Sequence, residues 1–451
     1  MSRVYFFILI FTNCFFYSDL RVQLADLAIT NITLIDGTGK VVQESKTILI
    51  KEGRFLDIID AKEKCKARSF VDGAGKYVIP GLFDNHVHIG PEFRWPLVMS
   101  QFIHFGITSV LIPGTNNQKF LQFKERIKEE NLIAPHLYHT SLMISMEGKH
   151  PAKTYGDHYV DGVNVHYVKD ETSIEPIVSQ AVKDEAIAIK VMIEDGPQPP
   201  FVTRIPEKYV SLLSAQAHIV GLDFFAHVSD MYEVRAAVNN QADALMHFMG
   251  VQIDWENDLE VMQQIVDQNI SWVSTAMIGK SFFHPLNQEW LENEHYEVFS
   301  QEQKRYFNDE DGSMKATSTA VLENMFGGAE IPPEAMLKPM MEDIKKLYDM
   351  GVNIVVGTDL GGRPYIMPGY SFHEEMQLFE LSGFSGEQII QCATLNAAKM
   401  LKVDDDYGSI EKGKVADMVL LKKNPLIDIK NTLSIETVFK RGKVQKRLED
   451  E

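Results

Sequence analysis

The stretch IPGLFDNHVHIG, residues 79–90, runs from an apolar, turn-bracketed segment directly into two histidines one residue apart. Side chains two positions apart on a strand point to the same side of it. His86 and His88 would therefore direct two imidazole rings to one point, which is what a metal site needs. A short His-x-His pair also arises by chance, so the rest of the chain has to distinguish a metal site from coincidence.

Apolar, strand-like runs alternate with helical stretches from this motif onward. Eight parallel strands that alternate with helices are typical of a (β/α)8 barrel, whose strands are shielded on both faces and so look continuously apolar. We therefore predict an α/β fold with a (β/α)8 TIM barrel over residues 81–403, and functional groups at the C-terminal ends of its strands. The eight runs are GLFDNHVHI, GITSVLI, PHLYHTSLMI, AIAIKVMI, GLDFFAHV, DALMHF, ISWVST and GVNIVVGTD.

Short strands separated by Gly- and Asp-bearing turns flank the barrel region on both sides. AITNITLID, KTILIKEG and RFLDIID precede it from Ala28, and GKVADMVLL and IETVFKRGKV follow it. We expect the two ends to pair in a small composite β-sandwich made of residues 25–80 and 404–447. Residues 279–339 are longer than a normal βα loop. We interpret them as a helical insertion over the barrel mouth, or alternatively as a solvated surface excursion.

Composition and charge restrict the class of partner. The chain has 451 residues, of which 45% are hydrophobic and 24% charged, as in folded globular proteins. The 44 Lys and Arg against 63 Asp and Glu give a net charge of −19, which repels nucleic acid and anionic membrane surfaces. We expect a small-molecule substrate, no nucleic-acid partner and no membrane insertion of the mature chain, and we leave homo-oligomerisation open.

The first residues are typical of an export signal. One Arg precedes a mostly apolar run over residues 4–17, which is short for a transmembrane helix but suits a secretory signal. We predict a signal peptide over residues 1–20 and an exported protein, periplasmic in a Gram-negative host. The alternatives are an uncleaved anchor and lipidation at Cys14. N-terminal sequencing of mature protein from its native host should find a start within residues 18–26, and Met1 on soluble cytoplasmic protein would contradict export.

A lysine interrupts one of the apolar runs. Lys190 lies within AIAIKVMI, where an unpaired ammonium would cost several kcal/mol. Either a buried carboxylate pairs with it, or the uncharged amine captures carbon dioxide and becomes a carbamate able to bridge two divalent cations. Three further strand ends carry His227, His247 and Asp359. Each alone could be a core histidine or a capping aspartate, but one metal site explains all of these positions together.

The order of these residues resembles the metal-dependent amidohydrolase superfamily, and specifically its imidazolonepropionase-like branch, which includes Xaa-Pro and related dipeptidases. The resemblance covers nearly everything from about Ala28 onward. It is carried by the entry motif VIPGLFDNHVH, the strand around Lys190, the motif GTDLGG, and the closing run TLNAAKMLKVDDDYGSIEKGKVADMVLLKKNP. The matching residues are His86-x-His88, Lys190, His227, His247 and Asp359.

The resemblance implies a binuclear metal centre. The implied ligands are His86, His88 and Asp359 for a first divalent ion and His227 and His247 for a second, with a carbamate on Lys190 between them. Zn²⁺ fits nitrogen and carboxylate ligands best, and Mn²⁺ or Co²⁺ would also fit. A hydroxide bridging the ions would attack the scissile carbonyl, and Asp359 would be the catalytic residue that takes the proton and passes it to the leaving amine.

The implied function is a metal-dependent hydrolase that cleaves an amide C–N bond of a dipeptide or an N-acyl amino acid. Alternatives on the same metal site are a cyclic amidase of the imidazolonepropionase kind, a lactonase and a phosphotriesterase. A metal-free binding or assembly protein is the non-enzymatic alternative. Two departures matter. IEDGPQPPF, residues 193–201, replaces the Ser-Gly-Gly-type loop of many dipeptidase-like relatives, so specificity does not carry over. Asp230 stands where deaminases of the superfamily often place a Glu, which, with Lys190, argues against a deaminase.

Candidate substrate contacts come from two loops. His150 and Tyr155, with His158 nearby, belong to the loop after the third predicted strand, and Arg204 lies beyond the fourth. The planar guanidinium of Arg204 would suit a substrate carboxylate. The alternative is that each of these side chains is an ordinary loop or surface residue.

Overall fold

The computed structural model of the protein describes residues 24–448 apart from short gaps. The gaps are residues 91, 116, 157–158, 197–200, 288–293, 302, 305–308, 310–311, 327–332 and 362–364. The predicted signal peptide with Cys14, the residue His158 and the side chain of Tyr155 lie outside the described part. Within that part, no helix combines the length and the apolar character needed to cross a membrane.

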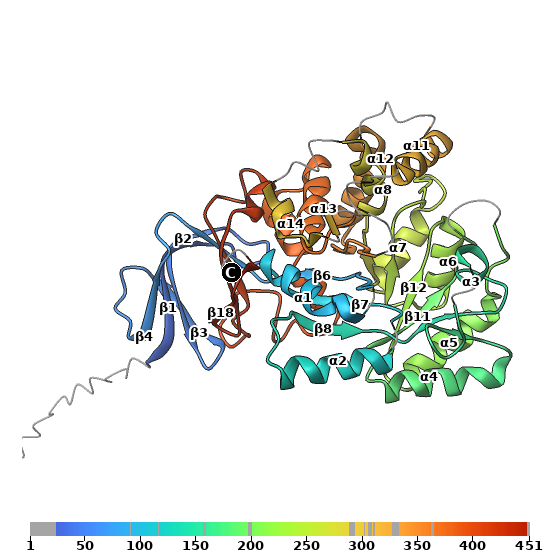
Figure 1. Cartoon of the computed structure of the whole chain (residues 1–451), viewed down its shortest axis with the longest axis horizontal. Coiled ribbons are helices and arrows are strands. Elements are labelled where there is room, and N and C mark those ends of the chain that lie inside the picture. Colours follow the sequence, from blue (N-terminus) through green and yellow to red (C-terminus); the bar gives the residue numbers. More distant parts are fainter. Residues whose placement is uncertain are drawn as a thin grey trace, which may run out of the picture.

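Strands from both ends of the chain pair in one eight-stranded sheet beside the parallel strands (Figure 1). The order is β18-β17-β16-β5-β1-β2-β3, with β4 paired to β1. The two ends meet where β5 and β16 pair antiparallel, with Pro80 opposite Met418. The strands are β1 (Ala25–Leu34), β2 (Gln43–Lys51), β3 (Arg54–Asp60), β4 (Ala67–Asp72), β5 (Tyr77–Pro80), β16 (Met418–Leu421), β17 (Ile435–Lys440) and β18 (Lys443–Val444).

Strand β1 begins at Ala25, three residues before the expected start at Ala28. Ala25 is fully buried and pairs with Ala67 of β4. Apolar side chains from both chain ends, among them Ile29, Ile48 and Met418, form the core of this sheet. Removing Ala25 would therefore remove buried contacts of β1. The predicted domain boundaries stay predictions.

The remaining strands form two parallel sheets, so the fold is mixed α/β. Each of the eight predicted runs contains at least one strand, the third is divided into β8 and β9, and β10 was not predicted. A three-stranded sheet has the order β6-β7-β8, and a seven-stranded sheet has the order β10-β9-β11-β12-β13-β14-β15. Their bounds are β6 (Leu82–Asp84), β7 (Ile107–Ile112), β8 (His136–His139), β9 (Met143–Ser145), β10 (Val165–Tyr167), β11 (Ala188–Met192), β12 (Asp223–His227), β13 (Ala244–Met246), β14 (Ser271–Val273) and β15 (Asn353–Val355).

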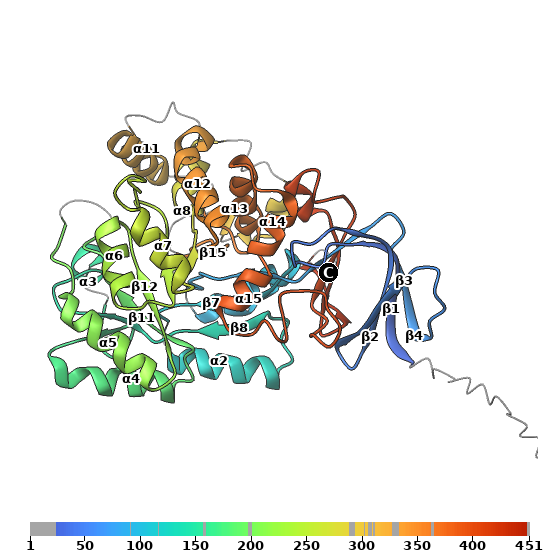
Figure 2. The same cartoon turned by 180° about the vertical axis from the view of Figure 1, so that it is seen from behind.

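Backbone hydrogen bonds link both edge strands of the three-stranded sheet, or the segments next to them, to the seven-stranded sheet. Ile187 N donates to His139 O at 3.0 Å, between the segments of β11 and β8. Asp359 N donates to His86 O at 2.8 Å, between the segments after β15 and β6. Side chains from eight of the parallel strands also share one apolar cluster with residues of α15: Phe83, Leu111, Tyr138, Ala188, Phe225, Ala244, Met246, Val273 and Val355. Figure 2 shows α15 beside these strands.

Helices separate the parallel strands along the chain and cover their outer side (Figures 1 and 2). A large apolar core joins them to the strands, with Phe102, Val178, Leu213 and Ile344 among its fully buried members. The helices are α1 (Trp95–His104), α2 (Asn117–Glu129), α3 (Ala152–Tyr155), α4 (Ile174–Lys183), α5 (Glu207–Ile219), α6 (Met231–Asn239), α7 (Leu259–Asp267), α8 (Met277–Ser281), α11 (Ser313–Phe326), α12 (Pro333–Met350), α13 (Tyr370–Leu381), α14 (Gly386–Cys392) and α15 (Leu395–Met400).

The segment predicted as an insertion, residues 279–339, is helical over much of its described part. It contains the end of α8, the 3-10 helices His284–Leu286 and Glu294–Val298, α11 and the beginning of α12. Ile278 and Phe282 at α8, together with Thr317 and Val321 of α11, line the large cavity at the ends of the parallel strands. Part of this segment therefore lines the cavity, and its role as a covering insertion stays a prediction.

Candidate metal centre

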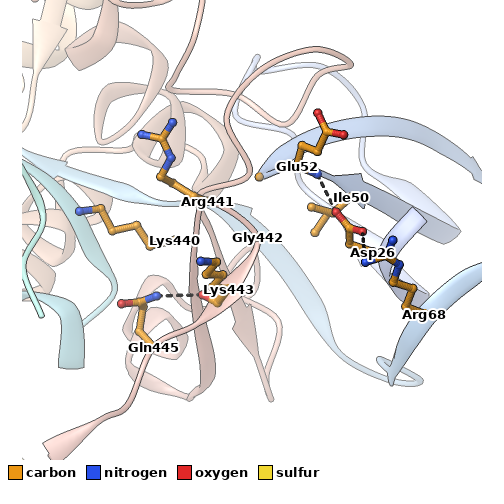
Figure 3. Close-up of a pocket in the computed structure, with 10 residues that line it drawn as sticks. Asp26, Ile50, Glu52, Arg68, Lys440, Arg441, Gly442, Lys443 and Gln445 are labelled. Carbon is orange, nitrogen blue, oxygen red and sulfur yellow. Dashed lines mark hydrogen bonds and ion pairs between the residues drawn. The ribbon is translucent and has the colours of Figure 1, made fainter. Parts of the chain in front are cut away.

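A cavity of about 1190 Å³ lies at the C-terminal ends of the parallel strands. Its lining includes all six residues predicted for the metal site: His86, His88, Lys190, His227, His247 and Asp359. His150 and Arg204 line it as well. Another pocket, of about 650 Å³ on the eight-stranded sheet, contains none of them (Figure 3). There the Asp26 carboxylate accepts a hydrogen bond from Glu52 N at 2.8 Å. The residues expected to carry chemistry are therefore gathered in the large cavity.

The Asp359 carboxylate lies between the two histidines of the opening motif. Its Oδ1 atom is 3.5 Å from His86 Nε2 and 3.3 Å from His88 Nε2. The His247 ring centroid lies 4.4 Å from that of His86 and 4.3 Å from that of His227. Donor atoms of His86, His247 and Asp359 all lie within 4.8 Å of one another. The structure thus brings the predicted residues together. His247, an implied ligand of the second ion, lies in the same donor group as His86 and Asp359, the implied ligands of the first.

Backbone contacts position the histidine motif, which lies just beyond β6 rather than inside a strand. Strand β6 ends at Asp84, whose carboxylate accepts hydrogen bonds from Thr358 N at 3.0 Å and Thr358 Oγ1 at 2.8 Å. Burial raises the pKa of Asp84 to about 7, and the hydrogen bonds from Thr358 act in the opposite direction. Because Thr358 directly precedes Asp359, this contact fixes the carboxylate relative to His86.

Two residues of the predicted metal site have left-handed backbone conformations. Asp359 has φ 56° and His247 has φ 76°. A residue other than glycine in this left-handed region costs ~1–3 kcal/mol and is found most often at functional sites. Gly361 has φ 87°, and a Cβ atom there would lie 2.2 Å from His88 O. Glycine is therefore required for the chain after Asp359 to pass the histidine motif this closely.

Lys190 is buried within the cavity wall, with 2% of its surface exposed. Its Nζ atom makes no hydrogen bond or ion pair with any residue that the structure describes. Burial lowers the pKa of Lys190 to about 7, although Asp359 and Glu194 act to raise it. Near neutral pH much of this amine is therefore uncharged, and an uncharged amine is the form that reacts with carbon dioxide. Of the two sequence interpretations, direct pairing with a carboxylate is not observed.

Glu194 is a cavity residue that the sequence analysis missed. Its Oε2 atom lies 3.3 Å from His150 Nε2 and contacts His227 Nε2. Donor atoms of these three residues also lie within 4.8 Å of one another. Lys190, Met192 and Glu194 alternate along the chain and all line the cavity, as expected for an extended segment. This period of two, continued past the end of β11, was the signal that could have identified Glu194.

The Arg204 guanidinium is held by three carboxylates of the chain itself. It lies 2.8 Å from Asp195 Oδ2 and 2.7 Å from Glu233 Oε1, and it also pairs with Asp230. Asp230 in turn caps α6 by accepting a hydrogen bond from Glu233 N at 2.9 Å. A role for Arg204 toward a substrate carboxylate stays a prediction, and it would require one of these pairs to open. The Asp230 carboxylate thus both caps α6 and pairs with Arg204.

Replacing Arg204 with methionine should destabilise the protein more at high pH than at low pH. The Glu233 side chain is fully buried, and burial raises its pKa to about 7 while Arg204 lowers it. Above pH 7 the ionised Glu233 would lose its cation, at an expected cost of ~2–4 kcal/mol. Near pH 5 the protonated carboxyl needs no cation, so the loss should be smaller. Denaturant unfolding at pH 5 and pH 8 measures both values.

The exposed pair of Arg126 and Glu130 provides the control for this experiment. Arg126→Met should leave the free energy of unfolding nearly unchanged at both pH values, as is usual for surface pairs. Equal unfolding free energies of Arg204→Met and the unmutated protein at pH 8 would show that Arg204 does not stabilise Glu233.

Comparisons with known proteins agree with the geometry. Residues 292–445 match the Amidohydrolase family, a segment that includes Asp359. An adenine deaminase from Desulforamulus reducens is 22% identical over 93% of this chain, which spans 57% of that protein's length. An imidazolonepropionase from Pseudomonas savastanoi pv. phaseolicola is 32% identical over 28% of this chain and 30% of its own.

A solved structure reproduces the fold over nearly the whole described chain. The crystal structure of a Xaa-Pro dipeptidase with bound methionine in the active site has a TM-score of 0.72 at 22% identity. The match covers 93% of this chain and 99% of that one. At this identity the likeness bears on the fold. Residues 292–445 thus match the Amidohydrolase family, and the fold of the chain resembles that of the dipeptidase structure.

Proposed function

We propose that the protein is a metal-dependent hydrolase that cleaves an amide C–N bond. One observation carries the proposal. The buried amine of Lys190 has no hydrogen-bond or ion-pair partner among the described residues, and it shares the cavity with Asp359 and the histidines. If Lys190 carried a carbamate, the negative charge of the carbamate would be balanced by the divalent ions, and the buried side chain would then have partners. The amidohydrolase family domain supports the same conclusion.

The site belongs, in this proposal, to a closed (β/α)8 barrel. Two features support closure: the backbone hydrogen bonds that link both sides of the three-stranded sheet to the seven-stranded sheet, and the apolar cluster shared by side chains of eight of the parallel strands. In such barrels, catalytic groups lie at the C-terminal ends of the strands, where the cavity lies. A composite domain made by the eight-stranded sheet would sit beside the barrel.

The donor set fits divalent ions such as Zn²⁺, Mn²⁺ or Co²⁺. Burial lowers the pKa of His86, His227 and His247 well below the ordinary value, which keeps these imidazoles in the neutral form that binds metal. His247 Nδ1 lies 3.0 Å from Thr275 Oγ1, so its Nε2 atom is left for the cavity side. A partner of this kind on the second ring nitrogen is the usual way in which a ligating histidine is oriented.

In the proposed mechanism, Asp359 transfers the proton from the attacking water to the leaving group. Divalent ions at such a site lower the pKa of water and polarise a carbonyl. The Asp359 carboxylate, held beside His86 and His88, would accept the proton of the attacking water and donate it to the leaving amine nitrogen. Thr358 and Asp84 would hold that carboxylate in place, and the burial of the site would exclude bulk water from the proton's path.

The cavity wall favours amides that carry an apolar group. Met143, Met192, Phe201, Met249 and Phe282 contribute apolar surface around the histidines. A dipeptide or N-acyl amino acid with a large apolar side chain would bury that group against them. Cyclic amides, lactones and phosphotriesters remain alternatives that would use the same centre.

The test is a substrate screen with metal-reconstituted protein. A library of dipeptides and N-acyl amino acids is assayed beside a cyclic amide, a lactone, a phosphotriester and adenine. We expect hydrolysis of linear amides with apolar side chains, abolished by chelation and restored by Zn²⁺ or Mn²⁺. Turnover confined to the lactone, the phosphotriester or adenine, in protein with bound metal, would contradict amide hydrolysis.

A further inference from the structure

Glu194 places a carboxylate where the motifs of the sequence predict none. It lies two residues after the end of β11, 3% of its surface is exposed, and it lines the cavity. Its Oε2 atom faces two imidazole nitrogens, His150 Nε2 at 3.3 Å and His227 Nε2 in direct contact. The neighbouring carboxylate, Asp195, turns to Arg204 instead. Only one of the two adjacent acidic residues is therefore directed at the histidines.

The orientation of His150 is fixed from its other side. Its Nδ1 atom lies 2.7 Å from Thr154 Oγ1, and that hydroxyl donates its own proton to Pro151 O at 3.1 Å. Because the hydroxyl proton is committed, His150 Nδ1–H must be the donor in the first contact. The assigned tautomer leaves a lone pair on Nε2, directed at a carboxylate oxygen. Two electron-rich atoms 3.3 Å apart are the separation expected of two ligands bound to the same small divalent ion at ~2.1 Å each.

We propose that His150, Glu194 and His227 form the protein side of a divalent-cation site, next to the site of His86, His247 and Asp359. The assignment rests on the proposed metal centre but not on the nature of the substrate. It makes Glu194 a direct ligand, and it gives the second ion a carboxylate of its own instead of relying on a carbamate for negative charge. His150 is then a ligand rather than a substrate contact.

Two consequences distinguish this site from the one implied by the resemblance. Removing the Glu194 charge should weaken one ion and leave the other, because the donor atoms of the two groups come from different residues. The second ion should depend on Glu194 even when Lys190 is intact. The segment IEDGPQPPF, which departs from the related Ser-Gly-Gly-type loop, acquires a physical role through its second residue.

The experiment measures Co²⁺ binding by the full chain rather than turnover. Metal-free protein is titrated with Co²⁺ alone, followed by isothermal calorimetry and by the visible absorption of the bound ion. Glu194→Gln keeps the shape of the side chain and removes its charge, and Asp195→Asn makes the same change one residue further on. Glu194→Asp and His150→Gln are measured in parallel, and thermal unfolding of each metal-free variant checks that it is folded.

We expect Glu194→Gln and His150→Gln to weaken the binding of one Co²⁺ ion by at least about tenfold, the lower limit for altering a metal shell, and to change its absorption. Asp195→Asn should bind as the unmutated protein does. Folded Glu194→Gln that binds every ion with unchanged affinity and spectrum would overturn the assignment. Unmutated protein that binds no ion would refute both this site and the proposed function, whereas two bound ions without amide hydrolysis would refute the function alone.

Discussion

Lys190→Ala should lose bound metal and hydrolytic activity together, and a short carboxylic acid such as formate or propionate should restore part of both. The amine that could carry a carbamate is buried and has no hydrogen bond or ion pair among the described residues. Alanine leaves a space that a small carboxylate can enter. We expect metal affinity to fall by at least about 10- to 100-fold, the range seen when a metal shell is altered, and activity to fall in parallel. Elemental analysis and rate measurements on the same preparations provide both values.

A second, partly buried lysine serves as the control for this prediction. Lys440 donates a hydrogen bond to Ala134 O, and burial lowers its pKa to about 8. It lies on β17, in the eight-stranded sheet and away from the cavity. Lys440→Met should keep its metal, whatever it does to stability. Full metal occupancy in Lys190→Ala without added acid would exclude a bridging carbamate.

Asp359→Asn should separate catalysis from metal binding. The amide keeps one oxygen donor and the size of the side chain, and the imidazoles around it are unchanged, so most of the metal should remain. Asparagine cannot accept the proton of the attacking water, and general acid–base catalysis is worth ~10²- to 10⁴-fold in rate. We expect kcat to fall within that range while metal stoichiometry changes little. The measurements are kcat on the best amide of the screen and metal content by elemental analysis.

His86→Ala gives the matched comparison. It removes an imidazole from the group that contains Asp359, so loss of metal should accompany loss of rate. If Asp359→Asn hydrolyses the amide within about threefold of the unmutated rate, well below the general-base range, Asp359 does not transfer the proton.

The order of strands along the chain was predictable, whereas their ends were less so. Apolar runs locate strands because a parallel sheet is covered on both faces, and each of the eight runs contains a strand. The histidine motif was expected within a strand, but β6 ends at Asp84. The chain after it is held by separate backbone hydrogen bonds to two segments: Val87 N donates to Leu111 O of β7 at 3.0 Å, and Asp359 N donates to His86 O at 2.8 Å. Strand β10, only three residues long, has no pattern that a sequence could reveal.

Some residues of the site could likewise be predicted from the sequence, and others could not. His227 and His247 could be named because polar side chains at the ends of apolar runs are conspicuous. Glu194 follows its strand by two residues and looked like part of a loop. The partners of Arg204 come from the loop after β11, from the cap of α6 and from within α6. Such a set depends on how separate segments approach in space, which spacing along the chain does not encode.

The sheet shared by the two chain ends has a consequence for how the protein forms during translation. Strand β5 has Met418–Leu421 as its antiparallel partner along its whole length, so the ribosome releases this partner only after the whole region of parallel strands has been made. At ~5–20 residues per second, the edge of β5 waits on the order of tens of seconds for it. An open edge of this kind is a site for wrong pairing between nascent chains. Slower synthesis over residues 81–417 should therefore increase aggregation, and chaperones that cover strand edges should reduce it.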